Sequence, residues 1–145
     1  MNNLTKMKLL KPAHDVFEAF LDPSKIGNFW FSSSSERWEQ GKTITLKYEE
    51  YNAEVQIKIL EIEKDKKIVF QWGANGEGHI VTMTFNELDH SVTHIEVNEA
   101  GFSEKDEELL TQILDNKEGW VFMLTCLKGY LEFGVSNLRG GLVKG

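Results

Sequence analysis

The chain has 145 residues, of which 41% are hydrophobic, and a formal net charge of −7. We expect residues 1–145 to form a single domain around one core, with a flexible tail at about 135–145. The negative charge and the scattered basic residues argue against a nucleic-acid partner, and no apolar run approaches the roughly 20 residues of a membrane span. A single cysteine, Cys126, and the lack of a signal-peptide pattern indicate a cytoplasmic protein.

The amino-terminal part of the chain predicts one strand followed by two short helices. Residues 4–10 are expected to form the strand. Pro12 suits the first position of a helix, and apolar residues then recur at helical spacing up to residue 21. A second short helix is expected within 23–30, because proline stops the first helix and can start the next. The serine run at 32–35 is expected to be a loop.

From residue 37 to residue 99, apolar and polar side chains alternate, which is the period of strands with one buried face. The alternation predicts about six antiparallel strands joined in sequence by short turns. The first hairpin is expected to include Trp38 and to turn at Gln40–Lys42. The apolar parity shifts by one residue around Leu60, so we expect a β-bulge there.

The carboxy-terminal segment Lys117–Gly134 predicts a long helix. Its apolar stripe is formed by Trp120, Leu124, Leu127 and Leu131. The opposite side, with Thr125, Lys128 and Glu132, is expected to face water. A separate or continuous helix is expected to start at Ser103, which can cap it, and to break or bend at 115–117. An apolar arc this wide requires a large partner, and a curved sheet can supply it.

Patterns for metal binding and covalent catalysis are weak. The glycine-rich segment Gly73–Gly78 is followed by a strand and not by a helix, so we interpret Asn75-Gly76 as a hairpin turn and not as part of a phosphate loop. His90 and His94 would lie about 13 Å apart in a strand, too far to share an ion. Cys126 is expected to pack as a small apolar side chain. We therefore predict no cofactor, no metal ion and no catalytic residue acting as a nucleophile.

The candidate site lies between the sheet and the last helix. Glu99 continues the alternation of Ile95 and Val97, so its carboxylate should face inward at the mouth of a cavity. There it could orient a ligand, act as an acid or base, or pair with a neighbouring group in a purely structural role. The inward aromatic residues either fill a solid core or line a pocket, and both interpretations stay open. The predicted ligand-binding residues are Trp30, Trp38, Phe70, Trp72, Met83, Phe85, Glu99, Trp120, Leu124 and Leu127.

Several short motifs occur in a specific order along nearly the whole chain. They are Lys-Pro-Ala-His-Asp-Val-Phe-Glu-Ala-Phe at 11–20, Asp-Pro at 22–23, Phe-Trp at 29–30, Ile-Leu-Glu-Ile-Glu at 59–63, Ile-Val-Phe-Gln-Trp at 68–72, Thr-Met-Thr-Phe at 82–85, Ala-Gly-Phe at 100–102 and Gly-Trp at 119–120. With the element order, these motifs resemble the START-related helix-grip (SRPBCC) superfamily. The most similar branch is related to the carboxy-terminal domain of the activator of heat-shock protein 90 ATPase.

The resemblance implies an α+β helix-grip fold, in which a curved antiparallel sheet of six to seven strands wraps around the long carboxy-terminal helix. It also implies that a small hydrophobic or amphipathic ligand binds between the sheet and that helix. Two alternatives are a co-chaperone-like module that acts on a heat-shock protein 90 type ATPase, and a cyclase or lyase that uses Glu99. The chain would be a monomer or a homodimer.

Overall fold

The computed structural model describes residues 1–73, 75 and 77–143, which form an α+β helix-grip fold, as predicted. In chain order the elements are β1 (Asn2–Leu9), α1 (Ala13–Leu21), α2 (Pro23–Ile26), β2 (Ser33–Ser34), β3 (Thr43–Tyr48), η1 (Glu49–Tyr51), β4 (Ala53–Glu63), β5 (Lys67–Trp72), β6 (Ile80–Asp89), β7 (Val92–Ala100) and α3 (Leu109–Phe133).

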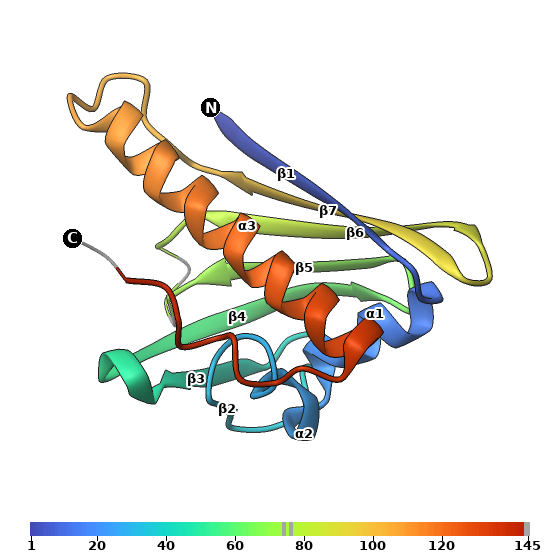
Figure 1. Cartoon of the computed structure of the whole chain (residues 1–145). Helices are drawn as coiled ribbons and strands as arrows, with labels where there is room; N and C mark the ends of the chain where they lie inside the picture. The colour runs from blue at the N-terminus through green and yellow to red at the C-terminus, as the bar shows by residue number, and fades with distance from the viewer. Residues whose placement is uncertain (74, 76, 144–145) are drawn as a thin grey trace.

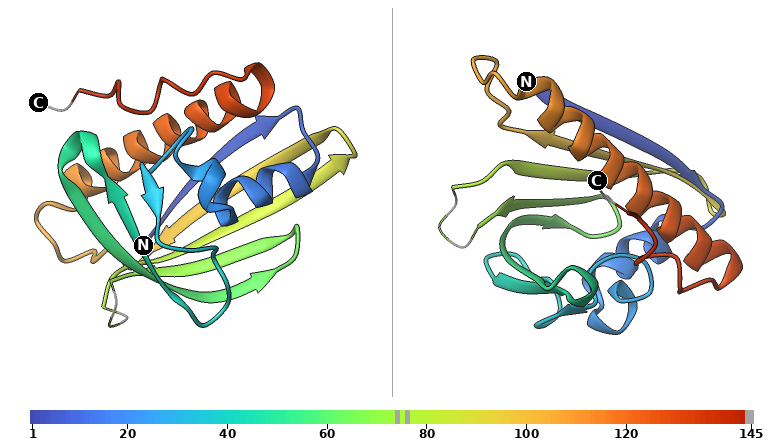
Figure 2. Two further views of the ribbon diagram at one scale, coloured as in Figure 1. Left: turned by 90° about the horizontal axis from the view of Figure 1, so that it is seen from below. Right: turned by 60° about the vertical axis from the view of Figure 1, so that its left-hand side comes forward.

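Seven antiparallel strands form one sheet in the order β1-β7-β6-β5-β4-β3-β2. The helix α3 lies diagonally across the concave face of this sheet, and α1 and α2 lie at the end where α3 finishes (Figure 1). Two further views show that residues 135–143 turn back after α3 and run beside it (Figure 2). The predicted wrapping of a curved sheet around one long helix is therefore confirmed.

The core lies between the concave face and α3. Strand residues at every second position are buried on this face, as shown by Met83 in β6 and Val97 in β7. The predicted bulge is confirmed, because the register between β4 and β5 shifts between Ile59 and Glu61. The shift leaves Leu60 at the surface, so the apolar residues on either side of it still reach the core.

The hairpin predicted around Trp38 is wrong. Trp38 lies outside the strands, and its ring is fully buried against Phe70, with the ring centroids 5.7 Å apart. One edge of β3 pairs with β4, and the other pairs with β2 in the serine run predicted as a loop, where Ser33 pairs with Lys47 and Ser34 pairs with Leu46. Burial of a large indole ring outweighs the local alternation that suggested a strand.

The predicted start of the carboxy-terminal helix is also wrong. The side chains of Ser103 and Asp106 accept hydrogen bonds from the amides two residues further on, in turns that precede the helix. The helix α3 begins at Leu109, continues without a break through 115–117, and ends at Gly134, which has the left-handed conformation typical of a helix end. Among the described residues, no helix is both long and apolar enough to cross a membrane.

Two further expectations concern turns. His90 lies in the turn between β6 and β7, whereas His94 lies within β7, so the two do not share one strand. The hairpin turn expected at Asn75-Gly76 falls partly outside the described residues.

The polar side of α3 is predicted to face water, and in the structure only part of it does so. Thr125 is exposed, but Lys128 donates a hydrogen bond from Nζ to the carbonyl oxygen of Lys8, at 2.9 Å. Glu132 accepts a hydrogen bond from the backbone N–H of Leu10, at 3.0 Å. These bonds satisfy backbone groups on and just after the edge strand β1, which would otherwise be open to pairing with another chain.

We expect Leu124→Ala to lower the free energy of unfolding by about 2–5 kcal/mol, because Leu124 is fully buried between α3 and the sheet. Val121→Ala on the exposed side of α3 is the matched control and should change it by less than about 0.5 kcal/mol. Chemical denaturation measures both. Equal losses in the two variants would contradict the assignment of the buried face.

Candidate functional site

A pocket of about 400 Å³ lies between α3, the carboxyl ends of β3 and β5, and the segment after α2. Seven of its twelve lining residues are aromatic, and this volume falls within the range of small-molecule sites. The lining residues are Phe29, Trp30, Tyr48, Tyr51, Trp72, Asp115, Asn116, Gly119, Trp120, Phe122, Met123 and Leu142.

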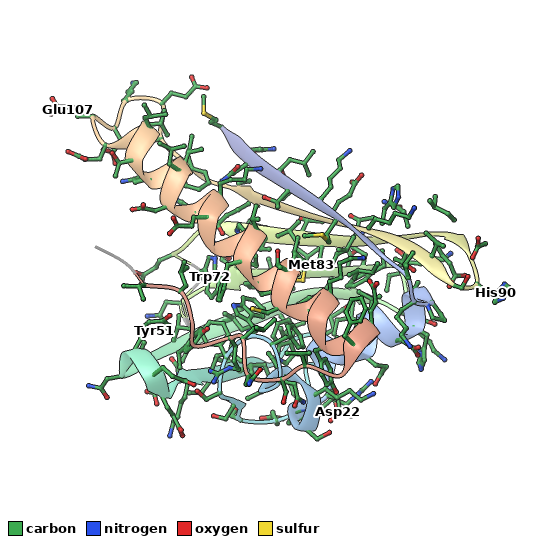
Figure 3. All side chains as sticks on the ribbon, viewed as in Figure 1. Asp22, Tyr51, Trp72, Met83, His90 and Glu107 are labelled. Atoms are coloured by element: carbon green, nitrogen blue, oxygen red, sulfur yellow. The ribbon has the colours of Figure 1, made fainter. Side chains whose placement is uncertain are left out.

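Three tryptophans form the inner wall of the pocket. The ring centroids of Trp30 and Trp120 are 5.5 Å apart, and the centroid of Trp72 is 6.5 Å from Trp30 and 6.4 Å from Trp120. Each comes from a different part of the chain: the segment after α2, the end of β5, and α3. Figure 3 labels Trp72 and Tyr51 on the side of the sheet where β3 and β5 end, away from Met83.

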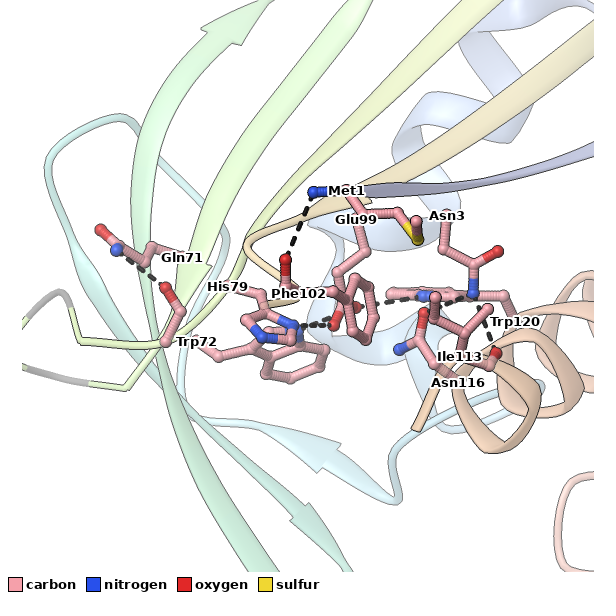
Figure 4. A network of polar contacts seen from close by, with 11 residues as sticks. Met1, Asn3, Gln71, Trp72, His79, Glu99, Phe102, Ile113, Asn116 and Trp120 are labelled. Carbon is pink, nitrogen blue, oxygen red and sulfur yellow. Dashed lines mark hydrogen bonds and ion pairs between the residues drawn. The ribbon is translucent and has the colours of Figure 1, made fainter. Parts of the chain in front are cut away.

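Glu99 lies behind this wall and holds it in place. Its side chain is 5% exposed, and its Oε1 accepts hydrogen bonds from the indole Nε1 of Trp72, at 3.3 Å, and of Trp120, at 3.2 Å. Its Oε2 lies 2.8 Å from Nδ1 of His79 (Figure 4). The predicted inward orientation of Glu99 therefore places a buried carboxylate where three polar donors can satisfy it.

Sequence reasoning did not find His79 as the partner of Glu99. The register of the β6–β7 hairpin pairs Ile80 with Ala100. His79 and Gly101, which lie just outside this pair, are therefore close together. A side chain at Gly101 would place its Cβ 2.8 Å from the imidazole of His79, so this glycine makes room for the ring. The ring of His79 also contacts Phe102, with centroids 4.4 Å apart. The sequence signal that could have predicted this contact is a glycine, Gly101, opposite the aromatic ring of His79 across the hairpin.

The ten residues predicted for the site occupy two different environments. Trp30, Trp72 and Trp120 line the pocket, and Glu99 lies directly behind it. The other six lie in the core and do not line the pocket: Trp38, Phe70, Met83, Phe85, Leu124 and Leu127. The remaining pocket residues were not predicted; they lie in the segment after α2, at the rim of the sheet, on α3 and in the tail.

The tail forms one side of the pocket, and we call residues 135–143 the strap. Arg139 anchors the strap through three contacts. Its Nε donates to the carbonyl oxygen of Trp30 at 2.6 Å, and its Nη2 donates to Oγ of Ser32 at 2.9 Å. Its guanidinium also forms an ion pair with Glu50. The hydroxyl of Tyr51 donates to the carbonyl oxygen of Leu142 at 2.7 Å. The strap thus carries Leu142 to the pocket wall.

The electrostatic environment near the strap favours neutral side chains and paired charges. Burial raises the pKa of Tyr48 to about 12, so its hydroxyl acts as a neutral donor to the carbonyl oxygen of Arg139, at 2.5 Å. Hydrogen bonding from Arg139 lowers the pKa of Glu50. Burial raises the pKa of the Cys126 thiol, which makes it a poor nucleophile. Within the described residues, no three potential metal ligands lie close enough together to hold an ion.

The family model described as "Activator of Hsp90 ATPase homolog 1-like protein" matches residues 11–132. This match confirms the family expected from the order of the motifs. No curated protein matches the sequence.

Several solved structures are similar to this chain. The protein SSP2350 from Staphylococcus saprophyticus is 52% identical, with 94% of this chain and 95% of that chain covered and a TM-score of 0.82. The Aha1 dimer from Colwellia psychrerythraea is 15% identical, with 92% and 98% covered and a TM-score of 0.79. CalU16 from Micromonospora echinospora is 18% identical, with 96% and 83% covered and a TM-score of 0.71. The last two show a shared fold.

We expect Glu99→Ala to lower the free energy of unfolding by about 2–4 kcal/mol, because it leaves the buried indole N–H of Trp120 and its neighbours without their acceptor. Glu99→Gln should cost less, since the amide oxygen can still accept from both indoles. Thermal or chemical denaturation measures the difference. If the two variants lost equal stability, the acceptor role of Glu99 would be refuted.

We expect Arg139→Ala to release the strap, because three groups of the protein hold this guanidinium. Amide hydrogen exchange at 135–143 should become at least about tenfold faster, since a hydrogen bond from a charged group contributes about 1.5–3 kcal/mol. Arg37→Ala is the control, because Arg37 pairs with Glu18 at the surface. Unchanged exchange in the strap would show that Arg139 does not hold it.

Proposed function

The chain belongs to the activator of Hsp90 ATPase homolog 1-like family, and we propose that it binds a small hydrophobic or amphipathic molecule in the pocket beside α3. The carrying observation is the lining: seven aromatic rings surround about 400 Å³, and the apolar side chains of Met123 and Leu142 complete the wall. Burying an apolar ligand there removes its surface and that of the rings from water, which favours binding.

The polar groups of the pocket suit an amphipathic ligand better than a purely apolar one. Asp115 and Asn116 lie on α3 at the rim, so a polar end of the ligand can stay near water while its apolar end contacts the tryptophans. Asn116 already accepts a hydrogen bond from Nδ2 of Asn3, at 2.9 Å, which fixes its side chain. A fixed rim of this kind supports one ligand orientation.

The pocket, and not the packed interior, supports the binding proposal. The interior below α3 is filled by fully buried side chains such as Met83 and Leu124. The pocket begins where α3 rises away from the ends of β3 and β5, and there Gly119, one of the two glycines of this helix, forms part of the wall. The absence of a side chain at this position contributes to the free volume.

An enzyme of the cyclase or lyase type that uses Glu99 is a second candidate. His79 supplies the further polar group that such chemistry needs, 2.8 Å from the Glu99 carboxylate. Against catalysis, three donors already engage both oxygens of Glu99, and neither residue lines the pocket. A chaperone partner, which the family name suggests, is a third candidate. We rank ligand binding first.

We expect Gly119→Leu to abolish binding of an apolar probe while leaving the fold intact. A Cβ at Gly119 meets nothing within 4 Å, so a leucine side chain can enter the pocket without a clash. Leucine also has a higher helix propensity than glycine by about 0.8 kcal/mol, so the variant should not lose stability. Tryptophan fluorescence during titration with 1-anilinonaphthalene-8-sulfonate and with neutral naphthalene measures binding.

Thr125→Leu is the matched control, because Thr125 lies on the exposed side of α3 and does not line the pocket. It should bind the probes as the native chain does. Native mass spectrometry of the purified protein would also reveal a ligand that copurifies. A native protein that takes up neither probe, or a Gly119→Leu variant that binds as well as the native chain, would refute this pocket as the binding site.

A further inference from the structure

Resting on the proposed function, we infer that the pocket selects ligands whose apolar or aromatic body carries a positively charged ammonium group. The faces of aromatic rings carry negative potential and attract cations, most strongly in Trp and least strongly in Phe. Trp30, Trp72 and Trp120 all contribute to the lining. The strength of this attraction depends on the charges around these rings.

The lining itself carries negative charge and no positive charge. Asp115 is a carboxylate on the rim, and none of the twelve described lining residues is Lys, Arg or His. Asp115 and Gly119 are four residues apart on α3, so they lie on the same face of the helix, one turn from each other. A cation in the pocket would therefore meet a carboxylate at the entrance, and no described lining side chain would repel it by a positive charge of its own.

A second carboxylate lies directly behind the tryptophan wall. Oε1 of Glu99 accepts hydrogen bonds from both Trp72 and Trp120, so its charge is one hydrogen bond away from two rings of the pocket. An indole that donates to a carboxylate gains negative potential on its faces, because the negative acceptor pushes electron density from the N–H bond back into the ring. Water screens this charge little, since the Glu99 side chain is 5% exposed.

One ring of the pocket already binds a cation. The guanidinium of Arg139 lies over the ring of Tyr48, with its central carbon 4.8 Å from the ring centroid. Arg139 is itself paired with Glu50, so this cation adds little net positive charge to the site. His79 contacts the Glu99 carboxylate and does not line the pocket.

The test compares the binding of two probes of the same shape to the chain of residues 1–145. Phenyltrimethylammonium carries a positive nitrogen where tert-butylbenzene has a neutral carbon, so the two differ in charge and hardly in size. Titration followed by tryptophan fluorescence should show binding of the cation at least about tenfold tighter than that of the neutral probe.

Two variants locate the source of the preference. Asp115→Asn should reduce the ratio of the two affinities by about threefold, and Glu99→Gln should also reduce it while keeping an acceptor for both indoles. Glu107→Gln is the matched control, because Glu107 is an exposed carboxylate that does not line the pocket, and it should leave the ratio unchanged. If Glu99→Gln does not fold, Asp115→Asn decides the question alone.

The outcomes separate this inference from the proposed function. Equal or tighter binding of tert-butylbenzene would overturn the charge preference and leave ligand binding in place. Binding of neither probe would overturn both. If Asp115→Asn and Glu107→Gln reduced the cation preference equally, the preference would come from the net charge of the whole chain. That result would overturn its assignment to this pocket.

Discussion

The structure depends on the burial of one side of α3 in a curved sheet. Side chains such as Trp120, Leu124 and Leu127 can leave water only if a concave surface surrounds them, and the seven-stranded sheet supplies that surface. The bulge at Leu60 fits this requirement, because it bends β4 and keeps its apolar residues directed inward. On the other side of the helix, Lys117 and Lys128 donate to carbonyl oxygens of β1 and so close the free edge of the sheet.

The pocket is a consequence of the same geometry. A straight helix and a curved sheet cannot stay in contact along their full length, so a gap opens where the strands β3 and β5 end and α3 carries Gly119. The aromatic rings around this gap are fixed by polar groups that lie behind them. Glu99 holds two tryptophans from behind, and Arg139 fixes the strap that supplies Leu142. The charge of Glu99 and the shape of the pocket are therefore coupled.

The candidate site was only partly predictable. Alternation along β7 predicted that Glu99 faces inward, because the period of a strand fixes the side to which each residue points. The same rule could not distinguish Trp72, at the end of its strand, from Phe70 in the fully packed middle, although both point to the concave face. His79 and the strap were missed because their contacts join residues far apart in the sequence, such as Arg139 and Trp30.

The sequence alone determined the fold class, the order of the elements, the bulge near Leu60 and the buried side of α3. The order, the bulge and the buried side follow from local periodicity, which reports how each segment divides between water and core, and the fold class follows from that order together with the family resemblance of the motifs. The tertiary structure decided that Trp38 packs outside the strands, that α3 begins at Leu109, and that Lys128 and Glu132 bond near the sheet edge. It also decided which aromatic rings line free volume and which fill the core. Those outcomes depend on distances between segments, and no local pattern of residues contains that information.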